Sequence, residues 1–175
     1  TPEQAMYHFI SGYTAKVAGT ERGITEPKAT FSPCFGGPFL TQHPLRYAEL
    51  LKGKIEQHQS KVYLVNTGWS GGSAASGAKR ISIQNTRAMI TAILDGSIEN
   101  SDFETEPVFG LTCPSSLDGV ETSILNPRTA WENPEDYDIQ AAELAELFIT
   151  NFNTYGTEVE HLQSAGPLKQ NEAVI

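Results

Sequence analysis

The sequence has few cysteines, few basic residues and no long apolar run, and each shortage argues against a class of protein. Its two cysteines, Cys34 and Cys113, lie far apart, which favours free thiols in a reducing compartment over a disulfide scaffold. No run of about 18 apolar residues or N-terminal signal peptide occurs, so we expect no membrane span and a cytoplasmic location. The net charge of −9 argues against nucleic acid or an anionic membrane as a partner.

The sequence also lacks the spacings that build a catalytic or metal site. The histidines His8, His43, His58 and His161 are scattered, so we interpret them as surface or helix-capping residues and predict no metal site from this chain alone. Cys34 has no basic neighbour to stabilise a thiolate, which favours an unreactive thiol. No Gly-x-Ser-x-Gly or Ser-x-x-Lys motif occurs. We therefore predict no catalytic residue in this chain.

The apolar residues that are present indicate one α/β domain. Hydrophobic residues make up 39% of the chain, enough for a globular core. The continuous apolar run 61–66 is typical of a strand buried on both faces, in a sheet with flanking helices. The expected domain covers residues 1–168, and residues 169–175 form a surface tail. Because residue 1 already reads as a helix cap with no initiator Met, we expect a piece of a longer protein.

Four helices are predicted from caps and from apolar residues spaced three and four apart. The first begins with Thr1 as its cap and ends at Gly19, and the second begins at Pro44 after a His43 cap. A third covers 86–94, ends at Gly96 and turns four apolar side chains inward, and the fourth opens at Pro134. The four inward side chains of the third helix are Met89, Ile90, Ile93 and Leu94.

A glycine-rich loop, 69–80, nearly forms a phosphate-binding motif. Gly72 and Gly77 have the spacing of a P-loop, but Ala78 and Lys79 stand where that motif needs lysine and then a hydroxyl residue. The motif also needs a helix directly after it, whereas 81–84 reads as extended. The triphosphate is therefore not expected at this loop.

Two segments remain as candidate binding regions. Residues 68–87 follow the expected strand and carry Lys79, Arg80 and Arg87, which suits a nucleotide edge or a phosphate; a connector whose arginines pair with local acids explains them equally well. The second segment, 19–32, is rich in glycine, threonine and proline. It suits either a lid that closes over an anion or an ordered surface loop, and composition favours the loop.

Both segments carry a resemblance to a known family. Five segments of the chain are similar, in sequence and in order, to the C-terminal part of ATP-dependent phosphoenolpyruvate carboxykinases. They are residues 7–27, 30–36 and 64–69, Lys79 to Ile83, and Thr86-Arg87. The resemblance runs to about Leu168. Several ordered matches of this length make it specific.

The resemblance implies an enzyme that converts oxaloacetate and ATP into phosphoenolpyruvate, ADP and carbon dioxide, as an entry step of gluconeogenesis. It also implies a C-terminal nucleotide-binding domain with a mixed sheet, and a cleft shared with an N-terminal portion of the same enzyme. The family uses ATP with Mg²⁺ and a second ion, Mn²⁺. Its P-loop, metal ligands and oxaloacetate-binding arginine all lie upstream of the match to Thr1, so this chain alone is expected to be inactive.

Residue by residue, the resemblance assigns Arg80, Ile81 and Thr86 to the adenine and ribose side of ATP. It also assigns a mobile lid to the segment 19–32. The loop 71–78 is longer here than in some members of the family. The alternative, from another class, is a non-catalytic nucleotide-binding or interaction module. The expected lid residues are Gly19, Thr20, Glu21, Arg22, Gly23 and Thr25.

Overall fold

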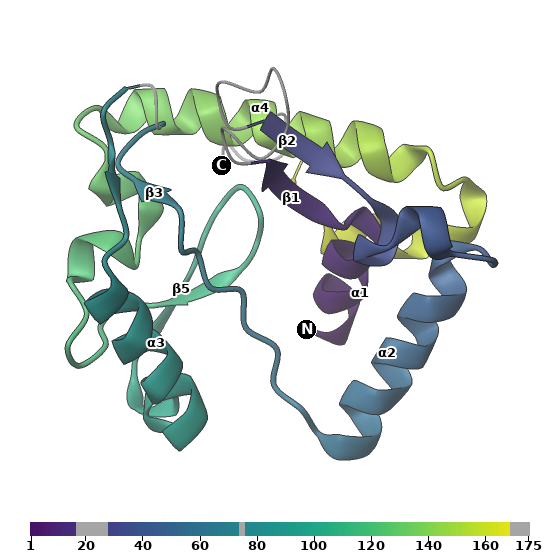
Figure 1. Cartoon of the computed structure of the whole chain (residues 1–175), viewed down its shortest axis with the longest axis horizontal. Coiled ribbons are helices and arrows are strands. Elements are labelled where there is room, and N and C mark those ends of the chain that lie inside the picture. Colours follow the sequence, from purple (N-terminus) through teal and green to yellow (C-terminus); the bar gives the residue numbers. More distant parts are fainter. Residues whose placement is uncertain (17–27, 74–75, 169–175) are drawn as a thin grey trace. The chain divides into compact units, whose positions relative to one another are not determined.

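The computed structural model describes residues 1–16, 28–73 and 76–168, which form two compact units (Figure 1). The first unit comprises 1–63 and 144–175, and the second comprises 64–143. The boundary falls inside the longest helix, α4 (Pro134–Asn153), so that helix contributes residues to both units. The expected tail, 169–175, lies outside the described residues, and the assignment of 1–168 to one domain stays a prediction.

The elements are short apart from three helices. The described part of the first unit contains α1 (Pro2–Ser11), β1 (Tyr13–Lys16), β2 (Lys28–Phe31), η1 (Pro33–Phe35), η2 (Gly37–Phe39), α2 (Pro44–His58) and η6 (Thr157–Ala165). The described part of the second contains β3 (Trp69–Ser70), β4 (Lys79–Arg80), α3 (Ile83–Asp95), η3 (Ser97–Asn100), β5 (Phe103–Thr105), β6 (Thr112–Pro114), η4 (Thr122–Ile124) and η5 (Pro127–Ala130). Among the described helices, none is both long and apolar enough to cross a membrane.

Helix α1 begins as the sequence predicts and ends earlier. The Thr1 hydroxyl accepts the backbone N–H of Gln4, and the Gln4 Oε1 atom accepts a hydrogen bond from the Thr1 amino group. These two reciprocal bonds form a capping box. The prediction that this helix runs to Gly19 is wrong, because Gly12 takes a left-handed conformation, φ 56°, and stops it after Ser11. The Gly12 carbonyl then accepts the backbone N–H of Ser32 at 3.1 Å.

A hairpin follows this stop. Strands β1 and β2 are antiparallel, with Tyr13 opposite Phe31 and Lys16 opposite Lys28. Part of the expected loop 19–32 is therefore a strand. The six predicted lid residues fall between the two strands, at positions outside the described residues.

Helix α2 confirms the interpretation of His43 as a cap. The His43 Nδ1 atom accepts the backbone N–H of Leu45 at 3.2 Å, and its Nε2 atom lies 2.9 Å from the Tyr155 carbonyl oxygen. Because Nδ1 accepts, the neutral ring carries its proton on Nε2 and donates it to Tyr155. This single side chain therefore caps α2 and ties it to the chain beyond α4.

Aromatic stacking builds the core of the first unit. The ring of Tyr7, on α1, stacks on Phe152 of α4 at a centroid distance of 4.0 Å, and Phe148 contacts both Tyr13 and Phe31 of the hairpin. Burial raises the pKa of the Tyr7 hydroxyl. The other side chains that fill this core are Met6, Ile10, Ala48, Ile55, Val159 and Leu162.

The expected buried strand at 61–66 is wrong. This segment has no regular secondary structure, and Val62 and Leu64 each expose 52% of their surface. The expected mixed sheet is also not found in the described part of the chain, whose strands form three separate two-stranded antiparallel sheets. Helices with small antiparallel sheets still fit an α/β fragment. A strand is buried on both faces only where other elements cover both faces of its sheet, and residues 61–66 belong to none of the described sheets.

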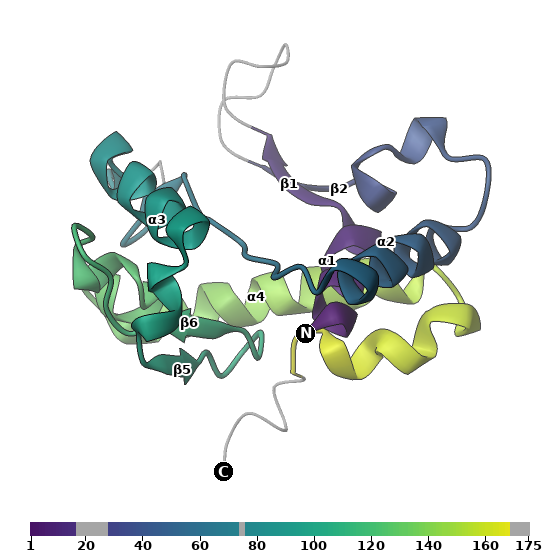
Figure 2. The same ribbon diagram turned by 90° about the horizontal axis from the view of Figure 1, so that it is seen from below.

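The second unit contains α3 and the β5–β6 pair (Figure 2), and α3 is hydrogen-bonded to the chain at Glu121. Buried Asn85 exchanges two hydrogen bonds with Glu121, each 3.3 Å, which satisfies its amide group inside the unit. Gly96, at φ 81°, ends α3 as predicted. The prediction that Ile90 and Leu94 point inward is wrong, because they expose 41% and 81% of their surfaces.

The stop at Gly12 generates a stability prediction. A Cβ atom at residue 12 would overlap the carbonyl oxygen of Ser32, and the left-handed backbone alone costs a non-glycine residue about 1–2 kcal/mol. We expect Gly12→Ala to lower the free energy of unfolding of the first unit by more than that amount. This change in the free energy of unfolding is measured by urea titration, with circular dichroism as the signal.

The matched control is Gly53→Ala in α2. Nothing lies within 4 Å of a Cβ atom placed there, so alanine is expected to raise stability by about 0.5–1 kcal/mol. Equal unfolding midpoints for the two variants would contradict this account of the Gly12 stop.

Candidate nucleotide-binding site

The candidate site begins at the turn that leads into β3. The Asn66 Oδ1 atom accepts the backbone N–H of Gly68 at 2.8 Å, and its Nδ2 atom donates to the Trp69 carbonyl at 3.4 Å. An asparagine that bonds the backbone two residues on is a common way to fix a turn. Asn66 therefore sets the direction in which the chain enters β3.

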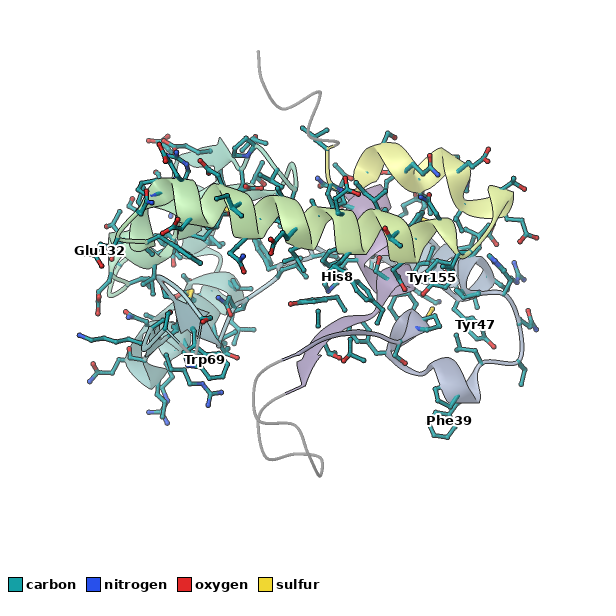
Figure 3. All side chains as sticks on the ribbon, turned by 90° about the horizontal axis from the view of Figure 1, so that it is seen from above. His8, Phe39, Tyr47, Trp69, Glu132 and Tyr155 are labelled. Atoms are coloured by element: carbon teal, nitrogen blue, oxygen red, sulfur yellow. The ribbon has the colours of Figure 1, made fainter. Side chains whose placement is uncertain are left out.

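The strand pair positions Arg80. Trp69 (Figure 3) lies opposite Arg80 in the β3–β4 register. The Arg80 guanidinium carbon lies 5.9 Å from the Trp69 ring centroid. The Arg80 Nε atom also donates to the Thr67 carbonyl at 3.2 Å. A guanidinium over an indole face is attracted by the ring quadrupole, so two contacts restrain an exposed cation here. Among the described residues, no acceptor is bonded to the other N–H groups of Arg80, which leaves them open to a ligand.

A helix begins directly after this strand. Ser82 caps α3, since its hydroxyl accepts the backbone N–H of Asn85 at 3.1 Å, and its carbonyl accepts that of Thr86 at 3.0 Å. The interpretation of 81–84 as extended is therefore wrong beyond Ser82. The sequence signal for this start was a serine directly before an apolar residue with helical spacing.

The structure brings the three predicted nucleotide residues onto one strand-to-helix junction. Arg80 ends β4, Ile81 donates its backbone N–H to the Gly68 carbonyl at 2.8 Å, and Thr86 lies in the first turn of α3. Arg80 is exposed, whereas Ile81 and Thr86 are half-buried. The junction thus offers a cation, an apolar side chain and a hydroxyl on a short length of chain.

Charge at this junction stays uncompensated within the described residues. Neither Arg80 nor Arg87 forms a salt bridge with an acidic residue in those parts of the chain, which removes the connector interpretation's expected acid pairs. Exposed Lys79 lies next to Arg80. The local positive charge suits an anionic ligand on an otherwise acidic protein.

Other chemistry-bearing groups serve structure. A cavity of about 290 Å³ in the second unit is lined by Glu106, Cys113, Arg128 and Tyr137, among others. The Glu106 carboxylate accepts the backbone N–H groups of Val108 and Phe109 and the Tyr137 hydroxyl, so both of its oxygens already have a donor. Burial, followed by the Glu106 carboxylate, raises the pKa of the Cys113 thiol, which disfavours a thiolate nucleophile.

Two expectations concern groups that this site does not supply. No cluster of three or more His, Cys, Asp or Glu side chains suited to a metal ion occurs in residues 1–16, 28–73 and 76–168. The predicted lid residues lie outside those ranges. The geometry of the described residues therefore tests neither the metal binding of the enzyme nor the role of the lid.

Comparison with known proteins identifies the family. A family model described as phosphoenolpyruvate carboxykinase matches residues 1–123, more than half of the chain. The chain belongs to the phosphoenolpyruvate carboxykinase family. The matched residues include the β3–β4 pair, α3 and Arg80, Ile81 and Thr86.

Individual members of the phosphoenolpyruvate carboxykinase family are similar over nearly the whole chain. The phosphoenolpyruvate carboxykinase (ATP) of Brucella anthropi is 51% identical over 168 residues, which cover 95% of this chain and 31% of that protein. The protein of the same name from Leptospira biflexa is 57% identical over 155 residues, covering 89% of this chain and 29% of its own length. The chain therefore spans about a third of the length of these relatives.

Three features of the candidate site were missed by sequence reasoning. Asn66 and Ser82 act through backbone hydrogen bonds, and both stand at positions where turn and cap preferences could have found them. The contact of Trp69 with Arg80 depends on strand register, which the sequence does not display.

The Ser82 cap predicts how α3 responds to substitution. Ser82→Ala removes the acceptor for the Asn85 N–H, and we expect a loss of about 1 kcal/mol in helix stability. Amide hydrogen exchange in the first turn of α3 should accelerate about fivefold. Ser82→Asp should restore protection because aspartate also caps, and Gln84→Ala is the neighbouring control; equal protection in Ser82→Ala and the unmodified protein would refute the cap.

A second prediction concerns the ion pair that joins η5 to α4. The Arg128 Nε and Nη2 atoms donate to the two Asp138 carboxylate oxygens at 2.8 and 2.9 Å, and this pairing lowers the pKa of Asp138. Because the folded-state pKa is lowered, the pair stabilises the unit above the ordinary aspartate pKa and loses this effect as pH falls through the lowered value.

Carboxyl NMR titration measures this pKa directly. Arg128→Lys, which cannot form the paired bonds, should raise the pKa of Asp138, whereas the control Arg87→Lys should not. An Asp138 pKa that is the same in both variants would show that the two-bond pairing does not cause the shift.

Proposed function

We propose that this chain is the C-terminal part of an ATP-dependent phosphoenolpyruvate carboxykinase and supplies the adenine side of its nucleotide site. The observation that carries the proposal is the family match, which extends across the strand-to-helix junction holding Arg80, Ile81 and Thr86. The proposed reaction breaks a carbon–carbon bond of oxaloacetate to release carbon dioxide. The enolate oxygen left behind takes the γ-phosphoryl group of ATP, giving phosphoenolpyruvate and ADP.

The three residues have distinct roles in this proposal. Half-buried Ile81 offers an apolar side chain to the adenine ring, and the Thr86 hydroxyl offers a hydrogen bond to the nucleoside. Arg80 supplies a cation that stacks on the base or approaches the phosphates. Its contacts with Trp69 and the Thr67 carbonyl hold it before ligand arrives, which reduces the entropy lost on binding.

In this proposal, the chemistry that depends on the cofactors takes place on parts of the enzyme outside this chain. ATP supplies the phosphoryl group, and Mg²⁺ and Mn²⁺ neutralise charge on the nucleotide and the enolate. The metal ligands, the P-loop and the oxaloacetate site are proposed to belong to an N-terminal portion outside this chain. The roles of Gly19, Thr20, Glu21, Arg22, Gly23 and Thr25 as a lid that excludes water remain part of the same proposal.

Activity of the complete product of the gene that carries this sequence tests the proposal. It should consume oxaloacetate only with ATP and a divalent cation, releasing carbon dioxide and ADP in equal amounts. The 175-residue chain by itself should show no such activity. ATP binding without turnover by the complete product would favour the non-catalytic module instead.

Substitution of Arg80 tests the nucleotide contact. In the complete gene product, Arg80→Ala should weaken ATP binding about tenfold, since a desolvated guanidinium–aromatic contact contributes about 1–2 kcal/mol. Thr86→Val should weaken it severalfold through one lost hydrogen bond of about 1 kcal/mol. Isothermal titration calorimetry measures both dissociation constants.

Lys54→Ala is the charge-matched control, because Lys54 is an exposed cation of α2 whose Nζ atom donates to Gln57, three residues further along the same helix. It should leave the ATP dissociation constant unchanged. The assignment fails if Arg80→Ala and Lys54→Ala bind ATP with the same affinity.

A further inference from the structure

One face of α3 carries a row of exposed apolar side chains. Ile83, Ile90 and Leu94 expose 71%, 41% and 81% of their surfaces. Their spacings of seven and four residues place them on a single stripe of the helix. At about 100° per residue, the stripe points directly away from Asn85 and Ala92, which face the core of the second unit.

Two opposite sides of α3 therefore carry side chains suited to burial. The second unit covers the side of Asn85 and Ala92 and leaves the stripe exposed. A surface helix of a globular protein normally has one apolar stripe and an opposite face of polar residues. Single exposed apolar residues need no explanation, whereas several in one row mark a contact surface. The same pattern explains why sequence reasoning placed Ile90 and Leu94 inward.

We propose that the stripe of Ile83, Ile90 and Leu94 docks against the portion of the same enzyme that lies outside this chain. The inference rests on the proposed function. Arg80 and Ile81 immediately precede α3, and Thr86 lies in its first turn. If they hold the adenine side of ATP, the portion that holds the phosphates must approach this end of α3.

The size of the relatives supports this occupant over a second copy of the chain. The match covers 31% of the Brucella anthropi protein and 32% of the Caldanaerobacter subterraneus protein, so about two thirds of such an enzyme lies outside the match. That portion offers ample surface to cover a stripe on one helix. A second copy would bring another adenine-side junction and no phosphate site.

Arg87 adds a chemical requirement to the covering surface. It lies in the same row, four residues after Ile83 and three before Ile90, and none of the described acidic side chains forms a salt bridge with it. Burying a guanidinium without partners is costly. The covering surface should therefore present apolar side chains together with a carboxylate or backbone carbonyl oxygens opposite Arg87.

Thiol accessibility in the complete gene product tests the docking. We expect the Ile90→Cys and Leu94→Cys thiols to react with N-ethylmaleimide about tenfold or more slowly than the Thr91→Cys thiol. Thr91 is an exposed neighbour on the flank of the stripe, which makes it the matched control. Peptide mass spectrometry separates these sites from Cys34 and Cys113, and equal rates at the three introduced thiols would overturn the proposal.

A measurement without substitution guards against misfolded variants. Hydroxyl-radical oxidation of Leu94 in the unmodified gene product should be several times slower in the native than in the urea-unfolded protein. Leu94 is 81% exposed in the 175-residue chain, so native and unfolded oxidation rates that are alike would show that nothing covers it in the complete gene product.

The identity of the covering surface and the proposed function are tested separately. Protection that is lost on dilution would identify a second copy as the occupant and overturn the proposal. Both labelling experiments are carried out without nucleotide. A protected stripe in a protein that neither binds ATP nor decarboxylates oxaloacetate would therefore reject the proposed function alone.

Discussion

The stacking of Tyr7 on Phe152 is the contact on which the first unit depends. It joins residues 145 positions apart and fixes α1 against the end of α4. Gly166 completes the arrangement, because a Cβ atom there would overlap the Tyr7 ring, so glycine lets η6 end directly on it. Near this stack, a 2.7 Å ion pair joins Lys52 of α2 to Glu3 of α1. The Phe148 ring of α4 contacts the hairpin. Most of these partners are distant in the sequence, so the first unit is held by long-range contacts.

The second unit depends instead on how α3 is fixed at its beginning. Ser82 sets the first residue of the helix, and the paired bonds between Asn85 and Glu121 decide which side faces the core. A helix with apolar residues on two faces could pack either way, so a polar contact selects the orientation. That selection places Arg80, Ile81 and Thr86 on an accessible junction.

The sequence allowed prediction of local features and failed where distant partners decide. The caps at Thr1 and His43 and the stop at Gly96 follow from side chains within a few residues, and all are confirmed. The run 61–66 and the inward side of α3 were wrong because burial depends on which surfaces meet, and periodicity alone does not specify this. For the site, resemblance supplied Arg80, Ile81 and Thr86, while the restraint of Arg80 by Trp69 required the register of β3 and β4.

The pairing of β1 with β2 has a consequence for the eleven residues between them. Because Lys16 lies opposite Lys28, the two ends of that segment are already held together by the hairpin. The entropy lost in closing a loop grows only slowly with its length, and here the fold bears that loss before any ligand binds. A change in the length of this segment therefore leaves its two anchor points in place.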